Sequence, residues 1–176
     1  MSVLKNIFCD DAVVVALGSN LTGQYRSSRA LLEAALTRFP TFGLNVTARS
    51  CFWRSAAWPN PADPPYFNAV ALVDTALDAR RIMRNLLDLE TQFGRIRDAE
   101  NGPRTLDLDL IGFGRDVIDE PGLILPHPRA HLRRFVMGPL AEICPEWRHP
   151  RLGRSAAELV ADAFVGADAR PLGDLD

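Results

Sequence analysis

The sequence predicts an α+β fold with a ferredoxin-like βαββαβ core, in which helices pack on an antiparallel sheet and further helices follow towards the C-terminus. Three observations lead to this prediction. Four segments have the apolar runs or the alternation of strands, and two segments have the spacing of amphipathic helices. Their order along the chain is that of two split βαβ halves.

In the first half, residues 11–17 form a short apolar run rich in valine, which stops at a Gly-Ser-Asn turn at 18–20. This pattern is typical of a buried strand. Apolar residues then recur at helical spacing from Ser28 until Pro40 ends the helix. Residues 44–54 alternate well enough for a second strand.

In the second half, residues 55–65 contain four prolines in eleven positions and can form neither a helix nor a central strand. A strand over 67–73 and an amphipathic helix over 78–93 follow. A second irregular and highly charged loop, 95–105, leads into a fourth strand at 106–113. Loops of this length in a compact domain are usually functional or disordered.

The rest of the chain predicts a turn-rich stretch and two more helices, at about 134–143 and 155–162. A length of 176 residues suits one domain with one sizeable core. We expect an N-terminal extension at 1–11, a single domain at 12–165 and a C-terminal tail at 166–176.

The cationic residues exclude several functions. The net charge of -2 gives no general attraction to nucleic acids or anionic membranes, so we expect neither as a partner. Lys5 is the only lysine, and it lies apart from any glycine-rich loop. A P-loop and a Schiff-base enzyme are therefore excluded, whereas phosphate binding by arginine remains possible.

The three cysteines, Cys9, Cys51 and Cys144, are widely spaced and form no metal-binding pattern. We interpret them as reduced thiols. The N-terminus lacks a signal-peptide pattern, and no stretch approaches the roughly 20 apolar residues of a membrane span. The sequence therefore predicts a soluble cytoplasmic protein.

Two aspartates alternate with leucines at 106–110, so strand periodicity places Asp107 and Asp109 on one face. One interpretation is a solvated face of an edge strand. The other is a pair of carboxylates that share hard cations, as when Mg²⁺ is held by carboxylates and substrate phosphates. Ile111 and Phe113 continue the aspartate face as apolar residues, which favours the second interpretation.

Cationic groups surround this strand in the sequence. Arg95, Arg97 and Arg104 occur just before it. Loop arginines often serve only solubility, but three of them ahead of paired aspartates could clamp a polyphosphate. His127 lies between two prolines, which argues against a zinc-binding helix and leaves a phosphate contact or simple packing.

Aromatic residues near the loops have two interpretations. Tyr66 and Asn68 flank Phe67, so they share the face of the strand opposite to it. Trp58 and Phe135 are further candidates. Core packing is the default for such rings, whereas an aromatic ring beside an amide suits a flat heterocycle with polar edges.

These segments together resemble the 6-hydroxymethyl-7,8-dihydropterin pyrophosphokinase family. The resemblance covers roughly residues 12–160, and its Gly-Pro-Arg-Thr-Leu-Asp-Leu-Asp run is highly specific. The matching segments are Leu17–Leu21, Tyr66–Ala69, Phe93–Arg97, Gly102–Leu110, Leu125–Arg129 and Phe135–Leu140.

The resemblance implies that diphosphate moves from ATP to 6-hydroxymethyl-7,8-dihydropterin, giving the pterin diphosphate and AMP in folate biosynthesis. It implies that Asp107 and Asp109 hold two Mg²⁺ ions and that Arg95 and Arg104 stabilise the transferred group. The other implied site residues are Glu90, Arg97, Leu110, His127 and Arg133 for the nucleotide, and Tyr66, Asn68 and Phe135 for the pterin.

Two other functions compete with this one. The Gly18-Ser19 and Asp-x-Asp elements also occur in polymerase-β-like nucleotidyltransferases, but there they lie about ten residues apart, and here nearly ninety separate them. A ferredoxin-like RNA-binding or regulatory module is the non-enzymatic alternative. Paired acidic residues on the fourth strand would repel RNA.

We expect the protein to be a monomer.

Overall fold

The computed structural model describes residues 9–57, 60–95 and 104–173. The described strands are β1 (Val13–Ser19), β2 (Asn45–Arg49), β3 (Trp53–Ser55), β4 (Tyr66–Asp74), β5 (Asp107–Phe113), β6 (Ile118–Glu120), β7 (Leu123–Leu125) and β8 (Arg170–Pro171). Six of them form one sheet in the order β5-β1-β4-β3-β8, with β2 also paired to β4. All of these pairings are antiparallel, and β5 lies at one edge.

The described helices are α2 (Ser28–Arg38), α3 (Ala79–Gln92), α4 (Arg134–Ile143) and α5 (Ala156–Asp162), with short 3-10 turns η1 (Phe39–Phe42) and η2 (Ala130–Leu132). Side-chain caps fix where two of them begin. The Ser27 hydroxyl accepts from the Ala30 N–H at the start of α2, and the Asp78 carboxylate accepts from the Arg81 N–H at the start of α3. None of the described helices is long and apolar enough to cross a membrane.

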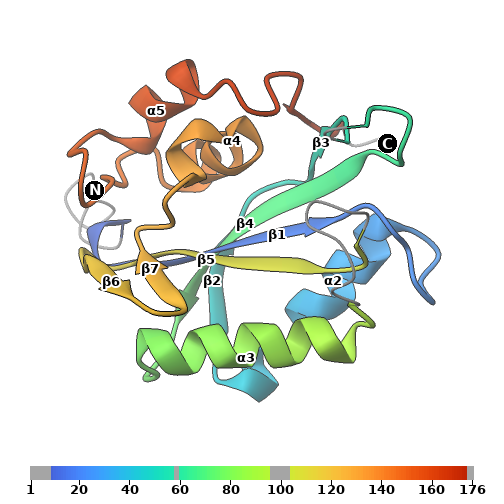
Figure 1. The fold of residues 1–176 in the computed structure, drawn as a ribbon, viewed down its shortest axis with the longest axis horizontal. Coiled ribbons are helices and arrows are strands. Elements are labelled where there is room, and N and C mark those ends of the chain that lie inside the picture. The colour runs from blue at the N-terminus through green and yellow to red at the C-terminus, as the bar shows by residue number, and fades with distance from the viewer. Residues whose placement is uncertain (1–8, 58–59, 96–103, 174–176) are drawn as a thin grey trace.

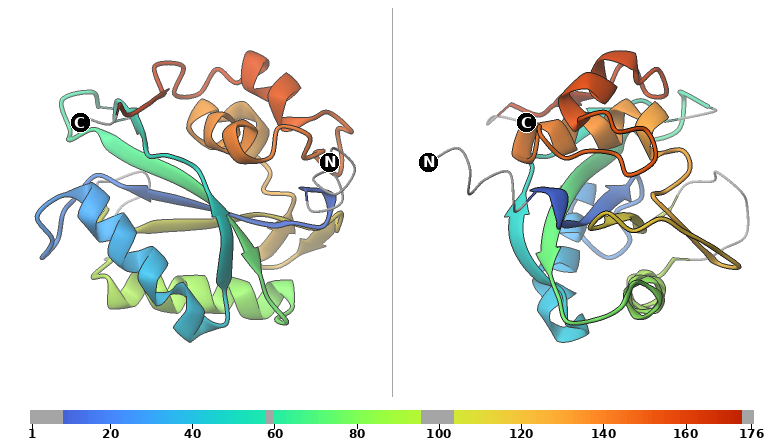
Figure 2. Two further views of the ribbon diagram at one scale, coloured as in Figure 1. Left: turned by 180° about the vertical axis from the view of Figure 1, so that it is seen from behind. Right: turned by 90° about the vertical axis from the view of Figure 1, so that its left-hand side faces the viewer.

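The elements form three layers, with α2 and α3 on one face of the sheet and α4 and α5 on the other (Figures 1 and 2). Two cores result. We call them the α2–α3 core and the α4–α5 core. The α2–α3 core includes Val15, Leu17, Leu31, Leu32, Ile82, Leu86, Leu108 and Leu110.

The α4–α5 core uses the opposite sides of the same strands. It includes Val14, Ala16, Val70, Leu72, Ile111, Met137, Leu140, Trp147 and Leu159. Since both faces of the central strands are covered, β1 is buried along its whole length. This explains why its sequence is a continuous apolar run rather than an alternation.

The alternation predicted for β5 holds up to a bulge. Leu108 packs in the α2–α3 core, so Asp107 and Asp109 point to the face that α4 covers. The register with β1 then shifts by one residue, which leaves Ile111 unpaired. As a result Ile111 stays on the aspartate face, but Phe113 packs against the α2–α3 core, so its expected place on the aspartate face is wrong.

The single strand expected over 44–54 is instead divided into β2 and β3. Between them, the Ser50 hydroxyl accepts from the backbone N–H of Val70. Glu142 of α4 accepts from the Cys51 N–H, at 2.7 Å, and from the Trp53 indole, at 3.0 Å. A side chain about 90 residues away therefore binds the backbone at this break, a contact that local alternation does not reveal. The β6–β7 hairpin and the short β8 were not anticipated either.

The cysteines correct a second expectation, since only Cys51 is a free thiol in the structure. Cys9 and Cys144 form a disulfide, with their α-carbons 5.8 Å apart and 135 residues between them in sequence. Both are buried in the α4–α5 core, where the N-terminal turn meets the end of α4. Burial, and then the hydrogen bond to Glu142, raise the pKa of Cys51 to about 11, so this thiol is protonated at neutral pH.

A thiol count tests the disulfide. Denatured without reductant, the protein should expose one reactive thiol per chain, and after reduction all three of its cysteines should react. Alkylation followed by intact-mass measurement distinguishes the two states. Three reactive thiols in freshly purified, never-reduced protein would show instead that Cys9 and Cys144 are reduced. A Cys51→Ser variant provides the control, since it should show none before reduction.

Candidate functional site

The candidate site lies on the aspartate face of the sheet, at the edge formed by β5. Gly18 on β1 pairs with Asp107 on one side and with Asn68 of β4 on the other. A Cβ atom at position 18 would come 3.3 Å from the amide oxygen of Asn68 and 3.8 Å from the Cβ of Asp107. The glycine therefore leaves the space between these two polar side chains open.

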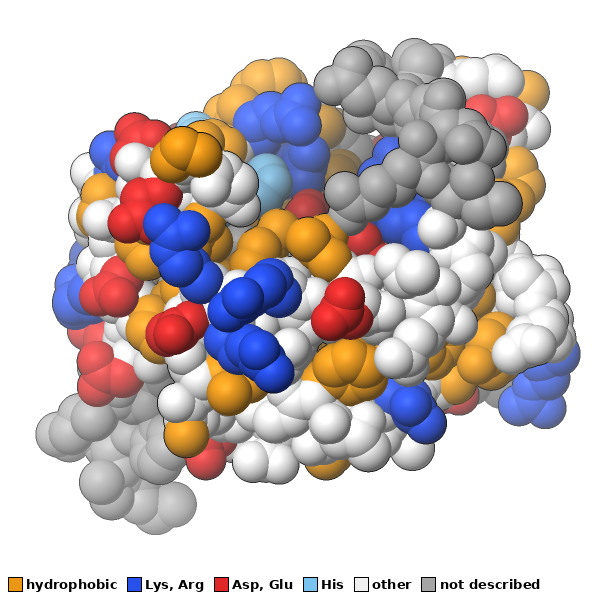
Figure 3. Space-filling view, turned by 60° about the horizontal axis from the view of Figure 1, so that its bottom comes forward, with side chains coloured by type: hydrophobic (Ala, Val, Ile, Leu, Met, Phe, Trp, Pro, Cys, Tyr) orange, Lys and Arg blue, Asp and Glu red, His pale blue; other side chains and the backbone are white. Residues whose placement is uncertain are grey.

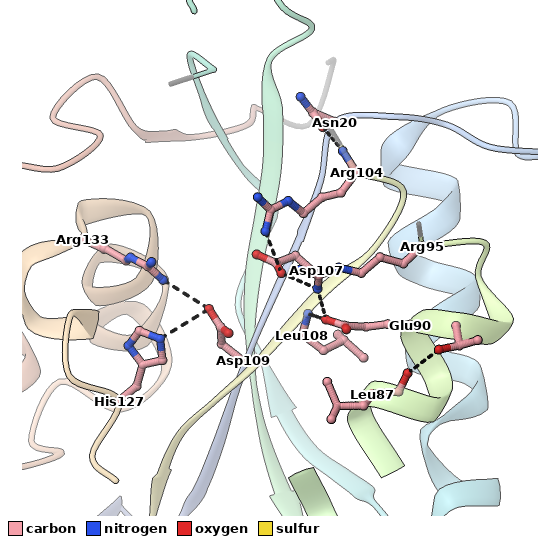
Figure 4. A network of polar contacts seen from close by, with 11 residues as sticks. Asn20, Leu87, Glu90, Arg95, Arg104, Asp107, Leu108, Asp109, His127 and Arg133 are labelled. Carbon is pink, nitrogen blue, oxygen red and sulfur yellow. Dashed lines mark hydrogen bonds and ion pairs between the residues drawn. The ribbon is translucent and has the colours of Figure 1, made fainter. Parts of the chain in front are cut away.

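Asp107 is held by two arginines. Its Oδ1 lies 2.6 Å from Nη1 of Arg95 and 3.2 Å from Nη1 of Arg104, and its side chain is 28% exposed (Figure 4). Burial alone would lower the pKa of Arg104, but Asp107 and Tyr66 raise it above its usual value. The expectation that Arg95, Arg104 and Asp107 lie together therefore agrees with the geometry.

Glu90 connects helix α3 to the edge strand. Its side chain is only 2% exposed, and its Oε1 accepts from the Leu108 N–H at 2.7 Å and from the Arg95 guanidinium (Figure 4). The Leu108 N–H points away from the sheet because β5 is an edge strand. The buried Glu90 carboxylate thus accepts a hydrogen bond from the outward N–H of the edge strand and orients Arg95 towards Asp107.

Asp109 faces a different pair of groups. Its Oδ2 lies 3.2 Å from Nη1 of Arg133, at the start of α4, and 3.8 Å from Nε2 of His127 (Figure 4). The His127 N–H donates to the carbonyl of Ile111, so the bulge in β5 anchors the segment that carries the histidine. Burial is the main cause that lowers the pKa of His127, and Arg133 and Arg129 act in the same direction.

Asn20 is a site residue that the sequence reading missed. Its side chain is buried and accepts from the Arg104 N–H at 2.9 Å, while its amide nitrogen donates to the Pro64 carbonyl at 3.1 Å. It therefore connects the segment carrying Arg104 to the proline-rich loop. Two sequence signals included Asn20, namely the Gly-Ser-Asn turn at the end of the first strand and the resemblance over Leu17–Leu21, and neither predicted these partners.

The three expected pterin residues come from two elements. Tyr66 and Asn68 lie at the start of β4, and Phe135 lies in the first turn of α4. Asn68 is buried, and its amide nitrogen donates to the Ser55 hydroxyl at 3.1 Å. Burial raises the pKa of Tyr66, while the neighbouring Arg104 opposes this effect. The Arg133 guanidinium lies 5.8 Å from the centre of the Phe135 ring.

Two of the expected nucleotide residues need separate comment. Arg97 lies outside the described residues, as does the aromatic candidate Trp58. Leu110 has its side chain in the α2–α3 core, on the opposite side of β5 from the aspartates. Any contact of Leu110 with a nucleotide would therefore come from its backbone.

The donor groups at the site fit a cation that is only partly held by protein. Within the described ranges, no group of three or more His, Cys, Asp or Glu side chains could enclose a metal ion. Two carboxylates on one strand face suit Mg²⁺, which usually keeps waters and shares its remaining positions with substrate phosphates. Basic, histidine and acidic side chains gather on this side of the molecule (Figure 3). The structure is thus a mixed α and β fold with an antiparallel sheet, whose edge strand carries two carboxylates paired with basic side chains.

Comparison with known proteins gives the family. Residues 14–145 match the model of the 7,8-dihydro-6-hydroxymethylpterin-pyrophosphokinase family. The 2-amino-4-hydroxy-6-hydroxymethyldihydropteridine pyrophosphokinase of Pseudomonas aeruginosa is 41% identical over 161 residues, which cover 90% of this chain and 96% of the relative. The enzyme of the same name from Synechocystis is 38% identical over 148 residues, covering 84% and 73%. The chain therefore belongs to the 7,8-dihydro-6-hydroxymethylpterin-pyrophosphokinase family.

Solved structures support the same fold. The structure of Plasmodium falciparum HPPK-DHPS, in its S436F/A437G/A613T form with pteroate, superposes with a TM-score of 0.68 over 91% of this chain. Sequence identity is 10%, so this likeness concerns the fold alone. The present chain spans 46% of that structure's length.

The position of Glu90 leads to a prediction about stability. Glu90→Ala should lower the free energy of unfolding by about 2–4 kcal/mol, because it leaves the Leu108 N–H without its acceptor and Arg95 without a buried partner. Glu90→Gln should cost less, since its amide oxygen can still accept from Leu108. Urea unfolding measures both effects.

The matched control is Glu33→Ala, which removes an exposed ion pair with Arg29 on α2. Exposed pairs of this kind contribute about 0–1 kcal/mol, so this variant should remain close to the unaltered protein. Equal stabilities of Glu90→Ala and Glu33→Ala would contradict the role assigned to Glu90.

Proposed function

We propose that this chain transfers diphosphate from ATP to 6-hydroxymethyl-7,8-dihydropterin, giving 6-hydroxymethyl-7,8-dihydropterin diphosphate and AMP in folate biosynthesis. The observation that carries the proposal is the pair Asp107 and Asp109, surrounded by Arg95, Arg104 and Arg133. This cluster falls within the span that matches the family model. It is an arrangement suited to a polyphosphate and its metal.

Asp107 and Asp109 are the residues that would hold two Mg²⁺ ions. Bound there, the ions would supply neutralisation of the charge on the phosphate oxygens. The two carboxylates already attract cations, since each lies against an arginine in the structure. When metal and ATP bind, the two carboxylates would pair with the metal instead of with the arginines. The arginines could then bind the phosphates.

Arg95 and Arg104 are proposed to stabilise the transferred group. Both reach Asp107 from the two ends of the charged loop, and Glu90 limits the movement of Arg95. A guanidinium presents paired N–H donors that match phosphate oxygens. Such donors favour transfer when they bind the developing charge more tightly than the ground state.

The remaining nucleotide contacts are proposed for Arg97, His127, Arg133, Leu110 and Glu90. His127 and Arg133 lie on the Asp109 side, so they would approach the phosphates from the side opposite Arg95 and Arg104 (Figure 4). Glu90 is buried against Leu108 and Arg95, which supports an indirect contribution through Arg95.

The pterin is proposed to stack between Tyr66 and Phe135, with its polar edge on Asn68. The side chain of Asn68 is already oriented by Ser55, and Gly18 leaves room beside it. An amide fixed in this way is suited to a heterocycle whose edge carries donors and acceptors, because misaligned hydrogen bonds in a buried site are costly.

The sheet order, with β5 beside β1, β1 beside β4, and β2 and β3 beside β4, supports a ferredoxin-like interpretation of the fold. In that interpretation α4 and α5 are C-terminal additions on the free face of the sheet. We further propose a single domain at 12–165 with an extension at 1–11 and a tail at 166–176. The proposed protein is a cytoplasmic monomer that binds these small molecules and no nucleic acid.

The direct test of this function is product analysis. The protein is incubated with ATP, Mg²⁺ and 6-hydroxymethyl-7,8-dihydropterin, and the nucleotides are separated. AMP and the pterin diphosphate should appear in equal amounts. Release of ADP, or no turnover, would reject the proposed reaction. Removal of Mg²⁺ with a chelator should stop product formation, and added Mg²⁺ should restore it.

Replacing the aspartates tests the metal assignment. Asp107→Asn or Asp109→Asn should lower kcat by roughly 100-fold or more, because several kcal/mol of charge stabilisation depend on the cations. Asp119→Asn, an exposed position on β6, is the control and should keep normal activity. Full activity of either site variant, with an unchanged circular dichroism spectrum, would remove the metal role.

A further inference from the structure

A segment near the C-terminus contacts α4, which carries Phe135, and β3, the strand paired with β4, which carries Tyr66 and Asn68. We call residues 163–172 the strap. It follows α5 and includes β8, and it lies beyond residue 145, where the match to the family model ends. Its contacts therefore belong to a part of the chain for which the family model provides no role.

At its first end the strap is attached to the start of α4. The Arg134 N–H donates to the Val165 carbonyl at 2.8 Å, and the Val165 N–H donates to the Leu132 carbonyl at 2.9 Å. Gly166 then packs against the Phe135 ring. A Cβ at position 166 would come 2.6 Å from Cδ1 of that ring, and Gly166 has a positive φ of 67°.

At its other end the strap is attached to β3 and the loop that follows. Arg170 pairs with Arg54, and the Leu172 N–H donates to the Phe52 carbonyl at 2.8 Å. Between these attachments, Oδ2 of Asp168 accepts from the Ala56 N–H at 2.6 Å. This is a charge-assisted hydrogen bond.

Ala56, which is bonded to Asp168, directly follows Ser55, which is bonded to Asn68. Ser55 is buried, and its hydroxyl accepts from the Asn68 amide. A cavity of about 310 Å³ lies at this point, between the strap and the proline-rich loop. Its lining includes Arg54, Ser55, Ala56, Ala57, Asp168 and Arg170. Because open space adjoins the loop here, packing alone does not fix Ala56, and the Asp168 bond contributes to its position.

We propose that Asp168 is a positioning residue for pterin recognition, acting through Ala56 and Ser55 on Asn68, and that the strap sets the distance between Asn68 on β4 and Phe135 on α4. This inference rests on the proposed function. Asp168 itself touches no reacting group. Both Asp168 and Ala56 are exposed, so water competes for the bond, and the expected effect is moderate.

The experiment measures two affinities for each variant: that of the dihydropterin in the presence of a non-hydrolysable ATP analogue and Mg²⁺, and that of the analogue alone with Mg²⁺. Asp168→Ala should weaken pterin binding by about fivefold, while binding of the analogue alone stays within about twofold. Asp168→Asn should recover most of the affinity, because its side-chain oxygen can still accept from Ala56. In turnover, KM for the pterin should rise with kcat nearly unchanged.

The matched control is Asp78→Ala, which removes another carboxylate that accepts from a backbone N–H, at the start of α3. It should lower thermal stability comparably but leave pterin affinity unchanged. Equal losses of pterin affinity in Asp78→Ala and Asp168→Ala would overturn the proposal, as would equal losses of pterin and analogue binding in Asp168→Ala.

A second variant tests the other end of the strap. Gly166→Ala should displace the Phe135 ring and also weaken pterin binding selectively. If Asp168→Ala does not fold, Gly166→Ala decides the question, and normal pterin affinity in that variant would overturn the proposal. Failure of the proposed function is distinguishable, since the unaltered protein would then release no AMP and bind no pterin.

Discussion

The structure depends on the balance of charge along the edge strand β5. Three carboxylates, those of Glu90, Asp107 and Asp109, lie along or beside seven residues of this strand, and in isolation they would repel one another. Arginines offset this repulsion, and Glu90 is tolerated at almost no exposure because a guanidinium and a backbone N–H both satisfy it. A ligand that enters the site therefore has to preserve the balance, which a polyanion can do only together with cations.

Much of the fold could be predicted because its signals are local. The continuous apolar run of β1, the alternation of β5 and the capped helices α2 and α3 each depend on neighbouring residues, and the structure places them within a few residues of the expected bounds. The split between β2 and β3 could not be predicted, since the groups at the break bond to Glu142 of α4 and to β4, which are distant in sequence. The Cys9–Cys144 disulfide was missed for the same reason, because spacing in sequence gives no information on partners brought together by folding.

The candidate site, like the fold, could be predicted only where its signals are local in sequence. Alternation predicted that Asp107 and Asp109 share a face, and the clustering of Arg95 and Arg104 ahead of them predicted a cationic surrounding. The sequence did not reveal that Glu90 orients Arg95, that Asn20 connects two loops, or that a bulge anchors the His127 segment. Each of these residues makes a hydrogen bond to at least one backbone group, and the two partners are distant in sequence.

The same contacts also affect how the sheet meets other molecules. An exposed edge strand offers unpaired backbone groups that can recruit a strand from a second chain, which is a common origin of aggregation. Along β5, the outward N–H of Leu108 donates to Glu90, and the carbonyl of Ile111 accepts from the His127 N–H. The bulge also interrupts the regular pairing of backbone groups. A further strand could add here only by displacing the groups that organise the site. Resistance to edge-to-edge association and the proposed binding of ligand therefore depend on the same few atoms.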